Sequence, residues 1–258
     1  MRNRKFDVGS INKNNYGTEM KIIEYNTYDD IVVEFQDEYK YKVRNTCNNF
    51  IKGDIKNPYD RTVYGIGYFG VGDYSWLSDQ RIYDAWKDML RRCYDPYKLN
   101  ENRYAEYRDC FVCDSWKNFQ NFAKWYDENY YEVPNESMQV DKDILNNGSK
   151  LYSPETCLIV PKRINQLFIG VNLIKDDGLP IGCSINKRVK EPYIMVTCRC
   201  GDERYISKTH YKLDQVEQAF LDYKKVKEKY IQQIATKYAA YLPSKVYRSL
   251  MGYKLKMK

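Results

Sequence analysis

Alternating hydrophobic and polar positions mark the first 72 residues. Short runs rich in β-branched and aromatic residues are separated by polar turns such as Tyr28-Asp29-Asp30. The runs are Met20–Tyr25, Ile31–Phe35 and Tyr39–Val43. Strand-like runs at this spacing predict a small antiparallel barrel or sheet. The glycine-rich stretch after Pro58 predicts a connector rather than a core element.

Helical spacing replaces the alternation in residues 73–170. One helix is predicted from Ser78-Asp79, which are good N-cap residues, and another after Cys113-Asp114. Their apolar faces are Ile82, Trp86, Met89 and Leu90 in the first helix, and Trp116, Phe119, Phe122, Ala123 and Tyr126 in the second. These aromatic stripes predict two helices that pack into a core.

The last block reads as three strands followed by helices. The strands are "LPIGCSINK", "YIMVTCRC" and "ERYISKT", and the predicted helices run from Leu213 to about Tyr230 and then through Ala240. The chain as a whole is predicted to be α+β. We expect a small β-rich domain in 1–72, a central domain in 73–170 and a sheet-plus-helix domain in 171–258.

The charge of the chain is distributed unevenly. The net charge is +7, and residues 171–258 alone hold 18 Lys and Arg against 9 Asp and Glu, a net charge of +9. A basic module attached to a nearly neutral body predicts a polyanionic partner. A solvated lysine-rich helix is the alternative.

Several classes of protein are not favoured by the sequence. It has no run that predicts a signal peptide or a membrane span, and eight cysteines in that context favour metal binding in a reducing cytoplasm over disulfides. The stretch "GIGYFGVG" lacks the following Lys-Ser/Thr of a phosphate-binding loop, so no nucleotide cofactor is expected.

Four cysteines of the central block have the spacing of a zinc site. Cys110 and Cys113 form a C-x2-C pair, whose thiolates can face one ion, and Cys93 and Cys157 lie in the same block. A structural zinc ion at these four residues would tie the helices to the following strands. The alternative is four buried, reduced thiols.

The stretch "VDKDILNNGSKLYSPETCLIVPKRINQLF", residues 140–168, predicts a strand, a loop, a second strand and a short helix. Asp141 ends the first strand and Asn165 lies in the helix. Both supply oxygen ligands of the kind that magnesium or manganese prefers. A divalent cation on a scissile phosphate is what a metal-dependent nuclease requires.

These residues resemble the HNH, or ββα-metal, endonucleases of phages and intron-homing enzymes. The stretches "IYDAWKDMLRRCYD" and "CFVCDSWKNFQNFAKWY" also resemble the zinc-containing phage members, so the resemblance spans most of residues 80–168. It implies a metal-dependent DNA endonuclease in which Asp141 and Asn165 bind the cation. Lys142 stands where the family has its general-base histidine, and Thr156 where it has a bracing asparagine.

The third block resembles the ethylene-response-factor type of DNA-binding domain, which is often fused to HNH nucleases in phages. In that family a three-stranded sheet enters the major groove and a helix packs behind it. The resemblance implies a double-stranded DNA partner. The residues that it implies face DNA are Asn186, Lys187, Arg188, Tyr193, Arg199, Arg204 and Lys208.

Lys142 decides between two functions. A lysine is protonated at pH 7, and the carboxylates of Asp141 and Asp143 reinforce this, so Lys142 is interpreted as a phosphate clamp or ion-pair partner rather than a base. Asp143 or a tyrosine could be the base instead. One hypothesis is a phage endonuclease, and the other is a catalytically silent DNA-binding protein, such as a phage regulator or an inhibitor of host defence.

Overall fold

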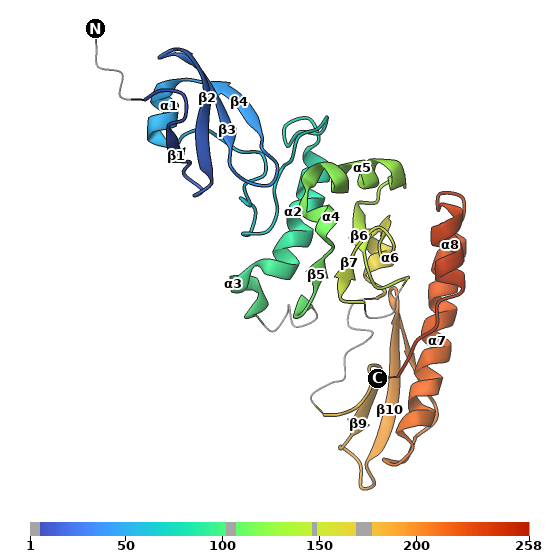
Figure 1. Ribbon diagram of the computed structural model, residues 1–258. Helices are drawn as coiled ribbons and strands as arrows, with labels where there is room; N and C mark the ends of the chain where they lie inside the picture. Colours follow the sequence, from blue (N-terminus) through green and yellow to red (C-terminus); the bar gives the residue numbers. More distant parts are fainter. Residues whose placement is uncertain (1–5, 102–106, 146–148, 169–176, 258) are drawn as a thin grey trace. The chain divides into compact units, whose positions relative to one another are not determined.

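The computed structural model describes residues 6–101, 107–145, 149–168 and 177–257 (Figure 1). The fold mixes helices with several small sheets, as the sequence predicts. Two compact units are distinguished, and each is described by itself. The first comprises residues 1–94 and 114–123, and the second comprises residues 95–113 and 124–258. No helix in the described part of the chain is long and apolar enough to cross a membrane.

The first unit begins with a four-stranded antiparallel sheet in the order β1-β2-β3-β4. Its strands are β1 (Ile11–Lys13), β2 (Glu19–Thr27), β3 (Asp30–Phe35) and β4 (Lys42–Asn45), and α1 (Cys47–Lys52) follows. Alternate residues of β2 and β3, including Met20, Ile22, Ile31 and Val33, form the core of this sheet. The predicted β-rich block therefore forms a sheet with one buried face.

The last strand of this sheet starts later than the sequence predicts. Tyr39 and Lys40 lie in a turn, because the side chain of Asp37 accepts hydrogen bonds from both of their backbone N–H groups. Lys40 has a φ of 50° there, in the left-handed region. The strand thus covers Lys42–Asn45 instead of Tyr39–Val43.

The glycine-rich stretch packs more tightly than a simple connector. A Cβ added at Gly67 would lie 2.5 Å from a Leu90 methyl carbon, and one at Gly70 would lie 2.4 Å from the Asn118 amide oxygen. Between them the Phe69 ring contacts the rings of Trp86 and Phe119. Gly67 therefore permits close backbone approach to α2 (Gln80–Tyr94), whose apolar face is buried as predicted, and Gly70 permits close approach to Asn118.

Two helices occupy the region for which one helix is predicted. They are α4 (Asp114–Lys117) and α5 (Phe119–Asn129), and the residue between them, Asn118, caps α5 by accepting the Gln120 N–H. An asparagine competes with helical backbone bonding, which accounts for the break. α5 begins in the first unit and ends in the second.

The described residues of the second unit form three small sheets. The short elements of its first part are α3 (Pro96–Leu99), β5 (Phe111–Val112), β6 (Met138–Asp141), β7 (Leu151–Tyr152), β8 (Leu158–Pro161) and α6 (Lys162–Asn165). β5 pairs with β7 in parallel and β6 pairs with β8 antiparallel. The β6–β8 hairpin followed directly by α6 forms the predicted strand–loop–strand–helix arrangement.

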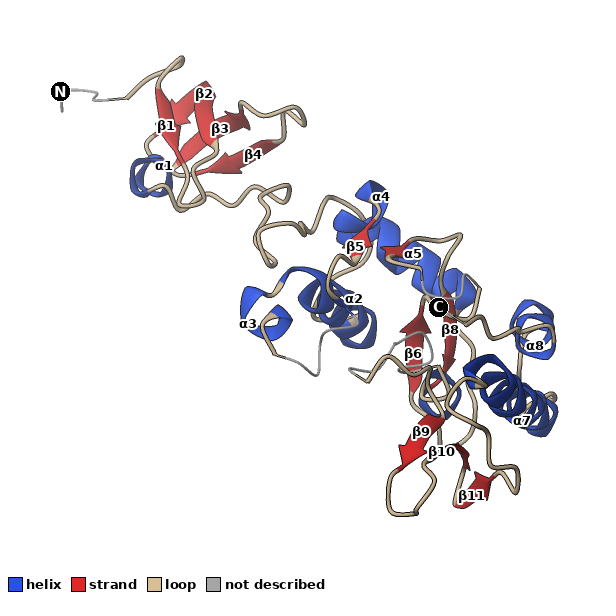
Figure 2. Cartoon of the chain, turned by 90° about the horizontal axis from the view of Figure 1, so that it is seen from below, coloured by secondary structure: helices blue, strands red, loops and turns tan. Residues whose placement is uncertain are grey.

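The third sheet has the order β11-β10-β9 and a helix packed on one face (Figure 2). Its strands are β9 (Cys183–Asn186), β10 (Tyr193–Cys200) and β11 (Glu203–Ile206). The prediction of two helices in this region, ending at about Tyr230 and at Ala240, is wrong. A single helix, α7 (Val216–Lys237), is followed by α8 (Ser244–Met251), because the apolar stripe of α7 continues through Ile231, Ile234 and Ala235.

One hydrophobic core runs through the second unit. It includes Val160 and Ile164 from the β6–β8–α6 region, Val196 from β10, and Leu250 from α8. The core therefore crosses position 170, where the sequence suggests a domain boundary. The division into three domains stays a prediction.

Candidate nuclease-like site and nucleic-acid interface

The β6–β8–α6 region positions Asp141 at the end of a strand. In the antiparallel register Asp141 lies opposite Leu158, and Val140 lies opposite Ile159. All four residues of β8 are buried, which fixes the hairpin in the core. Pro161 ends β8 and begins α6 at once, since its fixed φ suits a helix start. Asp141 and Asn165 are thereby placed by adjoining elements, as predicted.

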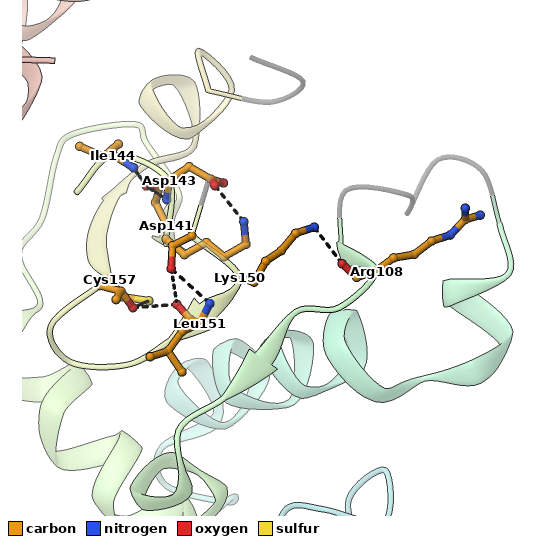
Figure 3. A network of polar contacts seen from close by, with 10 residues as sticks. Arg108, Asp141, Asp143, Ile144, Lys150, Leu151 and Cys157 are labelled. Atoms are coloured by element: carbon orange, nitrogen blue, oxygen red, sulfur yellow. Dashed lines mark hydrogen bonds and ion pairs between the residues drawn. The ribbon is translucent and has the colours of Figure 1, made fainter. Parts of the chain in front are cut away.

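Asp141 is buried and only half satisfied. Its Oδ1 accepts hydrogen bonds of 2.9 Å from the Asp143 N–H and 2.8 Å from the Ile144 N–H (Figure 3). Its Oδ2 is buried and has no hydrogen-bond partner among the described residues. Burial, reinforced by the Asp143 carboxylate, raises the pKa of Asp141 to about 7. Two backbone N–H groups thus hold one oxygen of the carboxyl group, and its other oxygen is buried without a partner among the described residues.

Asn165 lies on the same side of β6 as Asp141. Its Nδ2 donates a 2.8 Å hydrogen bond to Oε1 of Gln139. Gln139 precedes Asp141 by two residues, so both side chains are on one face of the strand. The Asn165 amide oxygen and the Asp141 Oδ2 are thus candidate ligands of one cation.

These residues fit magnesium or manganese in kind. A carboxylate oxygen left without a partner and a nearby amide oxygen are hard ligands, and Mg²⁺ is usually bound by one or two carboxylates with water completing the octahedron. Among the residues that the structure describes, no group of three or more His, Cys, Asp or Glu side chains could hold a metal ion. The cation site stays a prediction.

Lys142 is an ion-pair partner in this structure. Its ammonium lies 2.8 Å from the Asp143 carboxylate, and its side chain is 6% exposed. The ammonium also lies 6.0 Å from the ring centroid of Tyr107 and 5.9 Å from that of Tyr152. Burial lowers the pKa of Lys142, but Asp143, together with Cys110 and Asp141, outweighs this, and the net pKa is raised. This favours the ion-pair interpretation over a base or a phosphate clamp.

Thr156 braces the turn between β7 and β8. Its hydroxyl donates a 2.7 Å hydrogen bond to the Leu151 carbonyl and accepts a 3.0 Å hydrogen bond from the Ser153 N–H. The Ser153 hydroxyl in turn accepts from the Thr156 N–H at 3.3 Å. A threonine thus supplies local bracing at the position where the resembling family has asparagine.

Three of the four predicted zinc cysteines come from one part of the second unit. The Cys113 N–H donates to the Tyr152 carbonyl at 2.9 Å, Cys110 begins the same strand region, and Cys157 follows the turn after β7. Burial raises the pKa of the Cys110 thiol, and it raises the pKa of Cys157 to about 12; the Lys142 cation opposes both shifts.

Cys93 belongs to the first unit, where it is buried on α2. All eight cysteines are among the described residues and none forms a disulfide. The zinc site stays a prediction.

The predicted DNA-binding residues gather on one face of the third sheet. Ile194, Val196 and Cys198 of β10 are buried toward α7, so the alternate residues project from the opposite face. That face carries Tyr193 opposite Asn186, and Arg199 opposite Arg204. We call these four residues the helix-free face.

Three further predicted cations flank this face, and all three are exposed. Lys187 and Arg188 lie in the turn after β9, and Lys208 follows β11. The Asn186 amide donates to the Tyr193 hydroxyl at 3.0 Å, and the chain's single histidine, His210, stacks on the Tyr193 ring at 3.9 Å between centroids. His210 therefore belongs to this sheet.

Comparisons with protein families, with curated proteins and with solved structures give no match to this chain. The resemblances described from the sequence therefore stay predictions.

The sequence analysis did not identify several residues that belong to one or the other of the two candidate sites. Met195, Thr197 and Ile206 lie on the same side of the sheet as the helix-free face. Gln139 connects Asn165 to the strand of Asp141. The sequence pattern that could have identified them is the alternation along "YIMVTCRC" and "MQVD", because every second residue of a strand faces the same side of the sheet.

Proposed function

We propose that the chain binds double-stranded DNA through the helix-free face of the β9–β11 sheet. The flanking cations Lys187, Arg188 and Lys208 contact phosphates at the edges of the same surface. The net charge of +9 in residues 171–258 supports a polyanionic partner.

The pairing of Arg199 with Arg204 carries this proposal. The two residues lie directly opposite on neighbouring strands, both are exposed, and neither is ion-paired with a described residue. Like charges at such a cross-strand position destabilise a sheet. A phosphate backbone or the acceptor edge of guanine offsets that repulsion, and arginine binds either with two hydrogen bonds.

The shape of the sheet is compatible with this role. A narrow sheet or β-ribbon can enter the major groove, which is about 12 Å wide. α7 covers the other face and keeps the strands rigid. Tyr193 and Asn186 add a hydroxyl and an amide at the other end of β10 on the same face as the arginines, so the surface offers both donors and acceptors to base edges.

The binding proposal is tested by affinity for a duplex pool, measured by fluorescence anisotropy. The Arg199→Ala/Arg204→Ala variant should bind about 30-fold or more weakly, since removing each arginine from the interface costs about 1–3 kcal/mol. Arg248→Ala removes an exposed arginine from α8 and is the matched control. Equal affinities for all three proteins would contradict the proposal.

Metal-dependent phosphodiester cleavage is proposed as a second activity. The buried Asp141 Oδ2 without a partner supports it, since such an oxygen is costly unless it is bound to something. Asp141 and Asn165 would hold Mg²⁺ or Mn²⁺, which would supply Lewis-acid activation at the scissile phosphate. Asp141 would orient the ion, because two backbone N–H groups fix its carboxyl group.

The competing hypothesis is a DNA-binding protein without catalysis. The ion pair of Lys142 with Asp143 favours this hypothesis. These two residues directly follow Asp141 in the sequence, and in the structure they are bonded to each other. The chain's single histidine, His210, is the residue type that would serve as a general base, but it stacks on Tyr193 in the proposed DNA-binding sheet. On this hypothesis the β6–β8–α6 region is a scaffold.

A nicking assay on plasmid DNA with Mg²⁺ or Mn²⁺ separates the two hypotheses. Cleavage that Asp141→Ala abolishes and Lys142→Met retains supports the nuclease and assigns Lys142 a structural role. No nicking with either metal, with Asp141→Ala leaving DNA affinity unchanged, supports the silent protein.

A further inference from the structure

Two cysteines of β10 lie side by side behind the helix-free face. Cys198 and Cys200 are separated by one residue, so their side chains point to the same side of the strand, toward α7. Their sulfur atoms are 3.9 Å apart. Cys198 is buried and Cys200 is half-buried at the end of the strand, so a small oxidant can reach Cys200 first.

A buried cation accompanies the two thiols. Lys227 of α7 is 9% exposed and packs within the same core as β10. Burial lowers the pKa of Lys227, while Cys198 and Cys200 act electrostatically to raise it. Burial, reinforced by Cys200, raises the pKa of the Cys198 thiol to about 12, and the Lys227 cation acts against that rise, toward the thiolate that is the reactive form of cysteine.

We propose that Cys198 and Cys200 form a peroxide-sensitive thiol pair that closes to a disulfide and displaces Arg199 on the helix-free face. The site is distinct from the four cysteines assigned to zinc. Its ligand class is a hydroperoxide, for which hydrogen peroxide is the probe. The effect of Arg199 on DNA rests on the proposed function, whereas the disulfide itself does not.

The chemistry balances in two steps. The Cys200 thiolate attacks a peroxide oxygen, so an S–O bond forms and the O–O bond breaks; the leaving group, hydroxide from hydrogen peroxide or alkoxide from an alkyl hydroperoxide, takes up the thiol proton to give water or the alcohol. The Cys198 thiolate then attacks the sulfenic sulfur of Cys200, forming the S–S bond as the S–O bond breaks. Hydroxide leaves again and takes up the proton of Cys198. In sum two thiols and one hydroperoxide give a disulfide, water and the corresponding alcohol, or a second water.

Strand geometry links this bond to the DNA-binding surface. Residues two apart in a strand have Cα atoms about 6.6 Å apart, near the upper end of the range of about 4.4–6.8 Å that disulfides span, and their commonest distance is about 5.5–6 Å. Closing the bond therefore puckers β10 at the residue between the two cysteines. That residue is Arg199, which projects from the other face opposite Arg204.

Peptide mass after oxidation tests the disulfide. Full-length protein is reduced, treated with hydrogen peroxide, alkylated, and cleaved after aromatic residues. The peptide between Tyr193 and Tyr205 contains Cys198 and Cys200 but not Cys183. We expect this peptide to lose two hydrogens and to carry no alkyl group. Lys227→Met should slow the reaction several-fold relative to wild type.

Single substitutions provide the controls. Cys200→Ser and Cys198→Ser should each abolish the mass change, whereas Cys183→Ser, which alters a buried cysteine on the neighbouring strand, should preserve it. A peptide that stays doubly alkylated after peroxide treatment would overturn the proposal. So would a disulfide from either cysteine to Cys183.

DNA affinity tests the consequence for Arg199. Oxidised wild-type protein should bind a duplex pool about tenfold more weakly than reduced protein, which is about 1.4 kcal/mol, and Cys200→Ser should show no change. Unchanged affinity in a protein whose peptide mass proves the disulfide would overturn the link to Arg199. If reduced protein fails to bind DNA at all, the proposed function fails, while the peptide mass still decides the thiol pair.

Discussion

At the scale of single residues, Asp141 is the most informative position. Two backbone N–H groups hold one of its oxygens, and the other is buried without a partner among the described residues. A carboxylate in that position is destabilising unless a cation or proton neutralises it. The residue is therefore retained at a cost to stability, which is typical of functional sites.

The raised pKa of Asp141 predicts that the stability of the fold depends on pH. The folded pKa of about 7 lies above the ordinary value of 3.8, so the folded state holds the proton more tightly and stability falls as pH rises from about 4 to 7. Without added divalent cations, Asp141→Asn should raise the free energy of unfolding at pH 8 by up to about 4 kcal/mol.

Urea denaturation at pH 5 and at pH 8 measures this effect of Asp141→Asn. The increase in the free energy of unfolding caused by Asp141→Asn should be smaller at pH 5 than at pH 8. Adding Mg²⁺ at pH 8 should stabilise the wild type and leave the variant unchanged. A gain of equal size at both pH values would show that the Asp141 carboxyl is not perturbed.

Lys142 supports a second prediction at this scale. Its ion pair with Asp143 is buried on the lysine side but partly exposed on the aspartate side, with side-chain exposures of 6% and 24%. Lys142→Met keeps the packing against Tyr107 and Tyr152 but leaves Asp143 without its cation. We expect a loss of about 1–3 kcal/mol in the free energy of unfolding.

The matched control for Lys142→Met is the double variant Lys142→Met/Asp143→Asn, which removes both charges. It should recover most of the loss, since no charge is then left without its counterion. Thermal denaturation of the three proteins measures the recovery. A double variant no more stable than Lys142→Met would argue against the ion pair as the source of the effect.

At the scale of elements, the turn between β7 and β8 depends on Thr156. Thr156→Val keeps the shape but removes the hydroxyl that bonds the Leu151 carbonyl and the Ser153 N–H. We expect a loss of about 1–3 kcal/mol in the free energy of unfolding, because buried polar groups lose their partners. Thr156→Ser, which keeps the hydroxyl, is the control, and equal losses by chemical denaturation would contradict the prediction.

The sequence predicts elements best where periodicity is strong. Alternation located β2, β3 and β10, and the stripe of Trp86, Met89 and Leu90 located α2. Prediction from periodicity failed where the hydrogen bonds of individual side chains override the pattern. Asp37 moved the start of β4, and Asn118 split one predicted helix into two. The prediction also ended α7 too early, although the apolar stripe of Ile231, Ile234 and Ala235 continues the helix.

The candidate sites were partly predictable for the same reason. Alternation placed Arg199 and Arg204 on strands, but only the register makes them direct neighbours. The spacing of Asp141 and Asn165 indicated a shared site, whereas the ion pair of Lys142 depends on how its side chain lies in the fold. Contacts between distant residues, such as Gln139 with Asn165, follow from tertiary structure alone.

At the scale of the whole molecule, zinc is the first test. If Cys93, Cys110, Cys113 and Cys157 share an ion, purified protein should contain about one zinc per chain, and a chelator should lower its thermal stability. Cys157→Ser should lose the metal, and Cys47→Ser, which alters a buried cysteine at the start of α1, should keep it. Less than about half an equivalent of zinc in the wild type would favour four buried thiols.

The shared core of the second unit determines how DNA binding can be examined. Val160 and Ile164 pack in the same cluster as Val196 and Leu250, so deleting residues 171–258 would expose the core of the β6–β8–α6 region. Loss of binding in such a truncation could reflect unfolding. Surface substitutions on the intact chain avoid this.

The salt dependence of duplex affinity tests the central claim most directly. Anisotropy titrations from about 50 to 300 mM salt compare wild type with Lys187→Ala/Arg188→Ala/Lys208→Ala, in which three exposed flanking cations are removed. We expect a steep negative slope of log affinity against log salt in the wild type. For every phosphate that the variant no longer neutralises, that slope should flatten by about 0.9. An identical slope in both proteins, or no duplex binding by the wild type at low salt, would contradict the account.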